Sequence, residues 1–196
     1  MRTDEPSYVF ALDKNTGKTL WKVERPTDAQ MESPDSYETP QMARVAGQLQ
    51  LVISGADCVT GHEPGIGKEL WRMRGFYPTN NPAIRTIASS LVIGENVFVS
   101  SSRGRPFIGF RPENSGNITG KNELWTNSMG SDVPTHTTDG KYIYILGDSG
   151  IITGSKLQLE RSYIRECASK TEHIAHRPYW PTAQSTALAK TAQPRL

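Results

Sequence analysis

The fold of this chain is decided by the stretch Tyr8-Val9-Phe10-Ala11-Leu12-Asp13-Lys14-Asn15-Thr16-Gly17-Lys18-Thr19-Leu20-Trp21. Its first residues are aromatic and β-branched, a composition that favours a β-strand. Gly17 and Lys18 supply a tight turn, because glycine permits the positive φ that such turns need and lysine stays in water. Leu20 and Trp21 then return an apolar strand to the sheet. The stretch therefore predicts a β-hairpin closed by a tryptophan.

The closing phrase of this hairpin returns twice, as Ile66-Gly67-Lys68-Glu69-Leu70-Trp71 and as Thr119-Gly120-Lys121-Asn122-Glu123-Leu124-Trp125. The three tryptophans are spaced by 50 and 54 residues, a period typical of propeller blades, each of which is a four-stranded antiparallel sheet. The third copy has one extra residue between glycine and tryptophan, so we expect its hairpin to bulge. We expect each indole to pack between neighbouring blades, with its N–H bound to a fixed acceptor.

Other runs of β-branched and aromatic residues predict further strands. They are Leu49–Ser54, Leu91–Ile93, Val97–Ser100, Phe107–Phe110 and Tyr142–Leu146. Turn signals such as Ala46-Gly47 and Asp139-Gly140 separate them. Before residue 155 no stretch has the apolar spacing of an amphipathic helix. We therefore expect an all-β fold.

Composition excludes several classes of protein. The 196 residues carry 22 Lys and Arg against 20 Asp and Glu, without a block of like charge, so no nucleic-acid footprint is expected. The apolar runs fall far short of the roughly 18 residues of a membrane-spanning helix. No apolar segment follows the charged start, so no signal peptide is recognised and the compartment cannot be read from the chain. Cys58 and Cys167 lie too far apart in sequence for a C-x-x-C motif.

The repeat resembles the quinoprotein-type, or PQQ-like (pyrroloquinoline-quinone-like), β-propeller repeat family. The tryptophan-docking motif of that family has Ala, Gly and Trp at its first, seventh and eleventh positions. In the second copy Gly61 stands where the family has Ala. The resemblance implies a structural docking role for the residues that match the motif, which are Ala11, Gly17, Trp21, Gly67, Trp71, Gly120 and Trp125.

The resemblance implies a partial β-propeller of about three four-stranded antiparallel blades. We expect a half blade at 1–35, blades at 36–78 and 79–130, and a partial blade at 131–154. From 155 to 196 the chain is rich in Ser, Thr, Ala, Gln, Lys and Arg without turn signals, so an irregular or disordered tail is expected. Unpaired sheet edges recruit other strands, so self-association through open edges is also expected.

Two short motifs look catalytic but lack their context. Gly147-Asp148-Ser149-Gly150 resembles a serine-protease nucleophile loop, yet it stands where the repeat requires a hairpin turn. Gly65-Ile66-Gly67-Lys68 resembles a phosphate-binding loop, but His62 occupies the place of the first glycine and Glu69 follows the lysine. We interpret both as turns.

The candidate metal and charge sites are equally weak. His173 and His176, with Cys167 and Glu172, could ligate zinc, but they form one cluster in the irregular segment, so we expect solvated side chains. His62 and His136 are isolated and expected on loops. Positive charges surround the strand Phe107–Phe110 and could dock an acidic partner, although a solvated loop is the expected interpretation; they are Arg103, Arg105 and Arg111.

Three functions stay open. The resemblance implies a non-catalytic, protein-binding or scaffold segment of the cell envelope or periplasm, similar to the BamB-like branch of the family, whose partner is a protein or further blades. The alternative is a fragment of a PQQ-dependent quinoprotein dehydrogenase, which would use PQQ and calcium, and the third is a truncated chain without independent function. Because no Cys-Cys pair is present and no Asp, Glu or Asn matches the dehydrogenases' catalytic set, we expect no enzyme and assign no catalytic, cofactor-binding or metal-binding residue.

Overall fold

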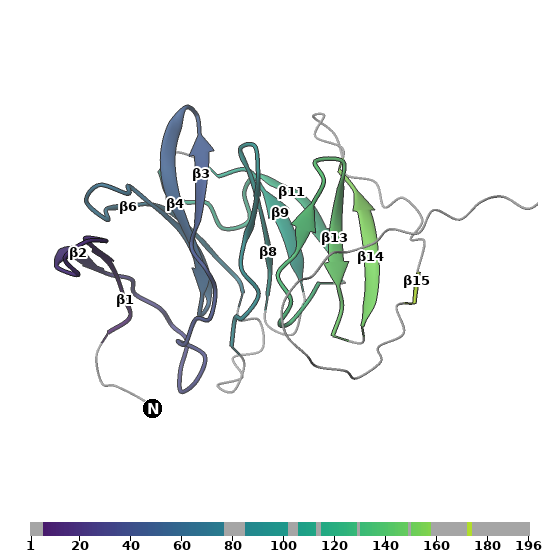
Figure 1. Ribbon diagram of the computed structural model, residues 1–196, viewed down its shortest axis with the longest axis horizontal. Coiled ribbons are helices and arrows are strands. Elements are labelled where there is room, and N and C mark those ends of the chain that lie inside the picture. Colours follow the sequence, from purple (N-terminus) through teal and green to yellow (C-terminus); the bar gives the residue numbers. More distant parts are fainter. Residues whose placement is uncertain are drawn as a thin grey trace, which may run out of the picture.

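The computed structural model describes residues 6–76, 85–101, 106–112, 115–128, 130–148 and 150–157, together with the backbone of 172–173. These residues form four β-sheets that stand side by side in chain order (Figure 1). No helix occurs among them. The all-β, partial-propeller fold is confirmed.

Apart from one short strand, each sheet is built from strands that follow one another in sequence and pair antiparallel. The first sheet holds β1 (Tyr8–Leu12) and β2 (Thr19–Glu24), and the second holds β3 (Gln41–Val45), β4 (Gln48–Gly55), β5 (Cys58–His62) and β6 (Glu69–Arg74). The third holds β7 (Leu91–Ile93), β8 (Asn96–Ser100), β9 (Phe107–Phe110) and β11 (Glu123–Asn127). The fourth holds β12 (Thr137–Thr138), β13 (Tyr142–Leu146), β14 (Ile151–Lys156) and β15 (Glu172–His173).

One short strand crosses between sheets. β10 (Gly116–Asn117) belongs in sequence to the third sheet, yet it pairs parallel with β6 of the second. The next residue, Ile118, is fully buried, and its N–H donates to the carbonyl of Arg72 at 2.9 Å. The connection between β9 and β11 thus covers the outer edge of the second sheet, which protects that edge from further pairing.

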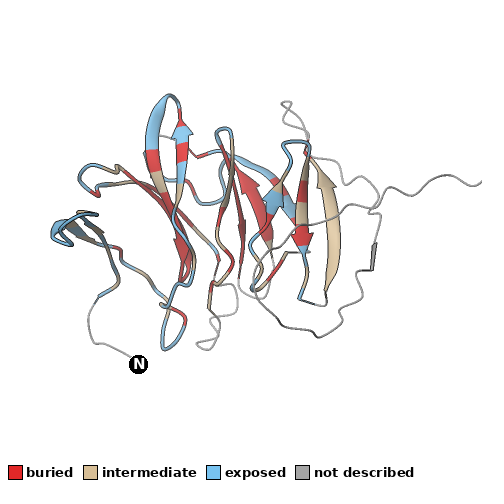
Figure 2. Cartoon of the chain, viewed as in Figure 1, coloured by how far each residue is buried: buried red, intermediate tan, exposed pale blue. Residues whose placement is uncertain are grey.

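Apolar burial is concentrated at two junctions (Figure 2). One cluster joins the second and third sheets, and a second cluster joins the third and fourth. Neither cluster includes a residue of β1 or β2. The first sheet is therefore attached to the rest of the arc by contacts of another kind.

The third hairpin bulges as expected, but its extra residue is not the cause of the bulge. The register shifts just before the tryptophan in all three hairpins, at Leu20, Leu70 and Leu124. The bulge therefore belongs to the repeat. The extra residue of the third copy is taken up instead by Asn122, whose φ of 56° is left-handed, a conformation that Asn tolerates better than most residues.

The β-structure runs past the expected boundary at residue 154. β14 continues to Lys156, and Leu157 is buried in the cluster that joins the third and fourth sheets. β15 pairs with β14 at Ile151 and Ile152. Apart from that short strand, residues 158–196 of the expected tail lie outside the described residues.

Candidate functional site: the sheet junctions and their rim

The motif residues occupy equivalent places in the three hairpins. Gly17, Gly67 and Gly120 all have φ near 70° and sit in the turn. Opposite each tryptophan, on the neighbouring strand, lies a small residue: Ala11 faces Trp21, Gly61 faces Trp71 and Gly109 faces Trp125. The docking role of the set stays a proposal.

Trp71 lies in the junction between the second and third sheets. It is 1% exposed, its ring centroid lies 5.8 Å from that of Phe110 in an edge-to-face arrangement, and its Nε1 donates to Oε1 of Gln50 at 2.6 Å. Trp125 is buried at the next junction, where it contacts Phe98 and Phe107. Each indole thus adds its area to the apolar cluster between two sheets.

Trp21 has a different environment. It is only half-buried and lies over the turn glycine of the next repeat, because a Cβ added to Gly67 would come within 2.4 Å of its Cε3. Its Nε1 donates to the carbonyl of Pro64 at 3.0 Å. The contact therefore joins the first sheet to a turn of the second and not to its apolar face.

Sequence reasoning missed part of this arrangement. A Cβ on Gly61 would come within 2.1 Å of Nε1 of Trp71, so the departure from Ala at that position makes room for the indole. Gly109 was not recognised as the third copy's first position, because the longer connection between β9 and β11 destroys the spacing of the motif. Gln50 carries no sequence signal for its role as acceptor.

The segments that lead into the sheets are hydrogen-bonded to one another and form a continuous rim, defined here as residues 36–39, 86–90 and 131–136. Backbone bonds run from Tyr37 N to Thr86 O at 3.3 Å and from Ala88 N to Asp132 O at 3.2 Å. Side chains add Thr39 N to Ser89 Oγ at 2.8 Å and Ser89 N to Thr135 Oγ1 at 3.1 Å. Three sheets thus share one polar edge.

Glu38 is the acidic group of the rim between the second and third sheets. Its half-buried carboxylate accepts hydrogen bonds from the backbone N–H and the hydroxyl of Ser54, and from the N–H and the hydroxyl of Ser90. Burial raises the pKa of Glu38 to about 7, although these donors oppose the shift. The carboxylate therefore bridges two sheets at a cost in desolvation.

His136 is the basic group of the rim between the third and fourth sheets. It is buried against the ring of Phe107, and its Nε2 lies 2.7 Å from the hydroxyl of Ser100. Burial lowers the pKa of His136 to about 4, so the imidazole is neutral at physiological pH. His62 was expected on a loop but ends strand β5, whereas His136 lies in the loop before β12, as expected. Both rings are buried and hydrogen-bonded.

Polar contacts fill the junction between the first and second sheets. Arg25, 4% exposed, donates to the hydroxyl of Thr60 and to the carbonyls of Ile53, Gly55 and Cys58. The following residues continue the pattern. The carbonyl of Pro26 accepts a hydrogen bond from Arg72, and the hydroxyl of Thr27 donates to Asp57. Asp28 pairs with Arg74, which also pairs with Asp57.

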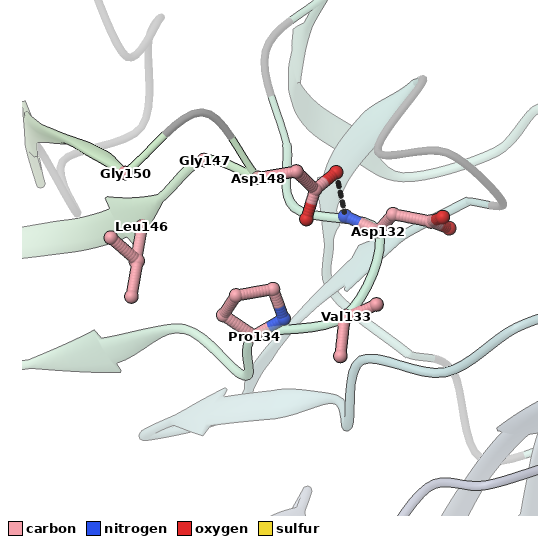
Figure 3. Close-up of a pocket in the computed structure, with 7 residues that line it drawn as sticks. All are labelled: Asp132, Val133, Pro134, Leu146, Gly147, Asp148 and Gly150. Atoms are coloured by element: carbon pink, nitrogen blue, oxygen red, sulfur yellow. Dashed lines mark hydrogen bonds between the residues drawn. The ribbon is translucent and has the colours of Figure 1, made fainter. Parts of the chain in front are cut away.

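An open pocket of about 640 Å3 lies on the rim side of the fourth sheet (Figure 3). Val133 and Pro134 of the rim and Leu146 at the end of β13 form its apolar wall. The carboxylate of Asp148 accepts a hydrogen bond from the backbone N–H of Asp132 at 3.3 Å, which ties the β13–β14 turn to the rim. The lining of the pocket thus combines apolar side chains with the aspartates Asp132 and Asp148.

The structure gives the two catalytic-looking motifs the roles of turns. The turn from Gly147 to Gly150 links β13 and β14, and Gly150 N donates to Gly147 O at 2.9 Å. In the second motif Gly67 N donates to Glu63 O, and Glu69 begins β6, so no helix follows the lysine. Ser149 lies outside the described residues.

The remaining candidates do not form a reactive site. Burial raises the pKa of the Cys58 thiol, which keeps it protonated despite nearby arginines. No group of three metal-ligating side chains occurs among the described residues. Arg111 is exposed and its Nε donates to Asn96. Outside the described residues lie Arg103 and Arg105, and the side chains of the candidate zinc cluster, Cys167, Glu172, His173 and His176.

That the chain binds neither PQQ nor calcium stays a prediction. A calcium ion needs several oxygen ligands at one place, and the described part of the chain offers no such cluster of acidic side chains. Trp21, Trp71 and Trp125 are each packed at a sheet junction or over a turn.

Comparison with known proteins agrees with this arrangement. The sequence profile of the family described as "Outer membrane protein assembly factor BamB" matches residues 2–159. The chain belongs to this family. No curated protein matches the chain. The described residues contain no helix with the length and apolar character needed to cross a bilayer.

Among solved structures, BamB from Moraxella catarrhalis is similar to this chain, with a TM-score of 0.55 and 15% sequence identity. The similarity covers 76% of this chain and 43% of that one. It shows the BamB-type propeller fold, and the chain spans less than half the length of that structure.

Proposed function

We propose that this chain is a non-catalytic propeller segment that binds protein partners in the cell envelope. The observation that carries the proposal is the rim, where hydrogen bonds join the leading segments of three sheets into one surface. Loops presented together by a rigid scaffold are where binding residues concentrate. The family description, an outer-membrane assembly factor, supports the compartment.

The rim carries side chains of the kind found at protein interfaces. Tyr37 is 56% exposed and Val133 is 55% exposed. Arg85 lies over the Tyr37 ring at 5.4 Å and donates to its hydroxyl. Aromatic residues and arginine are enriched in interface cores. Glu38 and His136 lie behind these side chains and are hydrogen-bonded to serines of the sheets, so in this proposal they stabilise the rim.

Site-specific photo-crosslinking tests this function. A photoreactive phenylalanine analogue replaces Tyr37 or Val133 in the full chain, directed to the periplasm of a Gram-negative host. The control site is Leu49, which is 44% exposed at the other end of β4. We expect adducts with identified envelope proteins from the rim sites and none from Leu49.

Two other outcomes would decide for the rival functions. Equal adducts from all three sites, or none from any, would overturn the binding surface and favour a chain without independent function. Dye reduction by the purified chain with added PQQ, calcium and an alcohol or sugar would favour a quinoprotein dehydrogenase. No cofactor and no nucleic acid is part of the proposal.

A further inference from the structure

His62, the last residue of β5, is a buried titratable side chain to which the proposed function gives no role. Its two ring nitrogens contact Gly67 and Thr60, each at 2.9 Å. Trp21 of β2 lies over Gly67, and Arg25, which directly follows β2, donates to the Thr60 hydroxyl. The imidazole therefore lies directly behind the contacts that join the first sheet to the second.

The hydrogen-bond partners of the ring determine its protonation state. The carbonyl of Gly67 can only accept, so Nδ1 of His62 carries a proton. The Thr60 hydroxyl accepts from Nε of Arg25 at 2.9 Å, because a guanidinium can only donate. The proton of that hydroxyl then points to Nε2 of His62 at 2.9 Å, a shorter contact than the 3.4 Å to the carbonyl of Ile53. The arrangement thus holds a neutral imidazole whose Nε2 accepts a hydrogen bond.

The charges around His62 also favour the neutral ring. Arg25 and Arg72 both disfavour a charged imidazole. Glu69 favours it, but its carboxylate already accepts two hydrogen bonds from Arg72, at 2.8 and 2.6 Å. Burial, followed by the two arginines, lowers the pKa of His62, although the Gly67 carbonyl and Glu69 oppose the shift. The ring therefore takes up a proton only in acid.

We propose that His62 is an acid-sensitive release for the first sheet. When Nε2 gains a proton from solvent it becomes a donor, so the Thr60 hydroxyl must accept from His62 and from Arg25 at once and turn its own proton to the carbonyl of Ile53. Two cations then share one buried oxygen, and their repulsion is strong where water is excluded.

Arg25 transmits this repulsion to the first sheet. Its backbone N–H donates to the carbonyl of Ser7 at 2.7 Å, so the residue extends the pairing of β1 with β2. Its guanidinium, 4% exposed, covers Thr60 from the side of the first sheet. Opening of the first sheet returns Arg25 and His62 to water and relieves the repulsion, so protonation favours the open state.

Amide hydrogen exchange of the full chain between pH 7 and 5 tests the proposal, with each rate divided by the intrinsic rate at that pH. A histidine whose pKa is lower in the docked state than in the open state weakens docking as pH falls below its ordinary value of 6.5, and has no effect above it. We expect the protection of β1 and β2 to fall by about threefold to tenfold between pH 6.5 and 5, relative to that of β8 and β9. His62→Gln, which stays neutral but still donates and accepts, should abolish this fall.

The matched control is His136→Gln, which removes the buried histidine of the junction between the third and fourth sheets. It should leave the pH dependence of β1 and β2 as in the wild type. Circular dichroism verifies folding, and His62→Asn replaces His62→Gln if that variant unfolds. Protection of β1 and β2 that does not change with pH in the wild type, or that falls as much in the folded His62 variant, would overturn the proposal. An equal fall in β8 and β9 would show that acid acts on the whole fold and would overturn it as well.

Discussion

The junctions on the two sides of the second sheet use the same sequence motif with different chemistry. On one side Trp71 lies in an apolar cluster shared with the third sheet. On the other side Trp21 lies over a turn, and Arg25 fills the space between the sheets with hydrogen bonds to Thr60 and three carbonyls. A repeated motif therefore fixes where the tryptophan lies in its hairpin, but the residues around it decide how much it stabilises.

The difference predicts unequal stability along the arc. Apolar burial contributes in proportion to the area removed from water, whereas hydrogen bonds that replace bonds to water contribute little net free energy. The first sheet, which is absent from both apolar clusters, should open locally before the rest of the arc unfolds. The second and third sheets should unfold together.

The largest expected effect is that of Trp71→Ala. Truncating a buried tryptophan removes its contacts and leaves a cavity, so we expect a loss of about 3–5 kcal/mol in the free energy of unfolding. It also deprives the buried Oε1 of Gln50 of its donor. Trp21→Ala, in contrast, should cost no more than about 1–2 kcal/mol, because the ring is half-buried.

Urea unfolding of both variants, monitored by circular dichroism, measures this difference. Equal midpoints for the two variants would contradict the distinction between the junctions. A larger loss for Trp21→Ala would reverse it.

The second prediction concerns the rim beside the apolar junction, where Glu38 titrates. Because its pKa is raised to about 7 from 4.5, the fold favours the neutral carboxyl. The stabilisation is fully present below pH 4.5 and is lost as pH rises toward 7. The loss amounts to at most about 3 kcal/mol, and less where solvent reaches the carboxyl.

Glu38→Gln isolates this effect, since it keeps the shape of the side chain without the charge. His136, whose pKa is lowered to about 4 from 6.5, acts in the opposite direction and costs stability as pH falls below 6.5. Between pH 4.5 and 6.5 the two contributions oppose each other, so we expect a nearly flat wild-type profile there, with stability falling below pH 4.5 and above pH 6.5. Glu38→Gln leaves only the contribution of His136, so the stability of the variant should rise with pH up to 6.5 and then stay level. Parallel wild-type and variant profiles from urea unfolding between pH 4 and 8 would contradict the assignment.

A third, smaller effect is expected from Gly61→Ala. The added Cβ would meet Trp71 at 2.1 Å, so the indole or the strand must shift, and we expect a cost of about 1–3 kcal/mol. Gly65→Ala is the control, because nothing lies within 4 Å of a Cβ there. A Gly61→Ala variant as stable as the control, measured by urea unfolding, would show that the indole moves freely and that the junction is not tightly packed.

The strands were well predicted where the sequence pattern is local. β1, β7, β9 and β13 coincide with the predicted strands, because aromatic and β-branched runs between turn residues are sufficient to define a strand. The tryptophan repeat also identified the family, since its spacing reflects the size of one sheet.

Long-range pairings could not be predicted in the same way. β10 is two residues long and pairs with a strand more than forty positions earlier, so no local pattern reports it. Gly109 was missed because the longer connection that contains β10 shifts the motif. Burial of Glu38 and His136 depends on serines contributed by neighbouring sheets, and an isolated charged residue in a sequence looks solvated.

The smallest global effect is expected from Arg25→Met, which tests the polar junction directly. Methionine fills part of the same space but donates no hydrogen bond, so the carbonyls of Ile53, Gly55 and Cys58 lose a buried donor. Those carbonyls lie where the first sheet meets the second, and local opening of the first sheet returns them to water. We therefore expect faster amide hydrogen exchange in β1 and β2, by about tenfold or more, with the exchange of β8 and β9 nearly unchanged. Arg44→Met, at an exposed arginine of β3 that donates to the carbonyl of Gly47 in the next turn, should change neither. If Arg25→Met instead accelerated exchange equally in all four strands, the first sheet would share one cooperative unit with the apolar core, and the contrast between the two junctions would not govern stability.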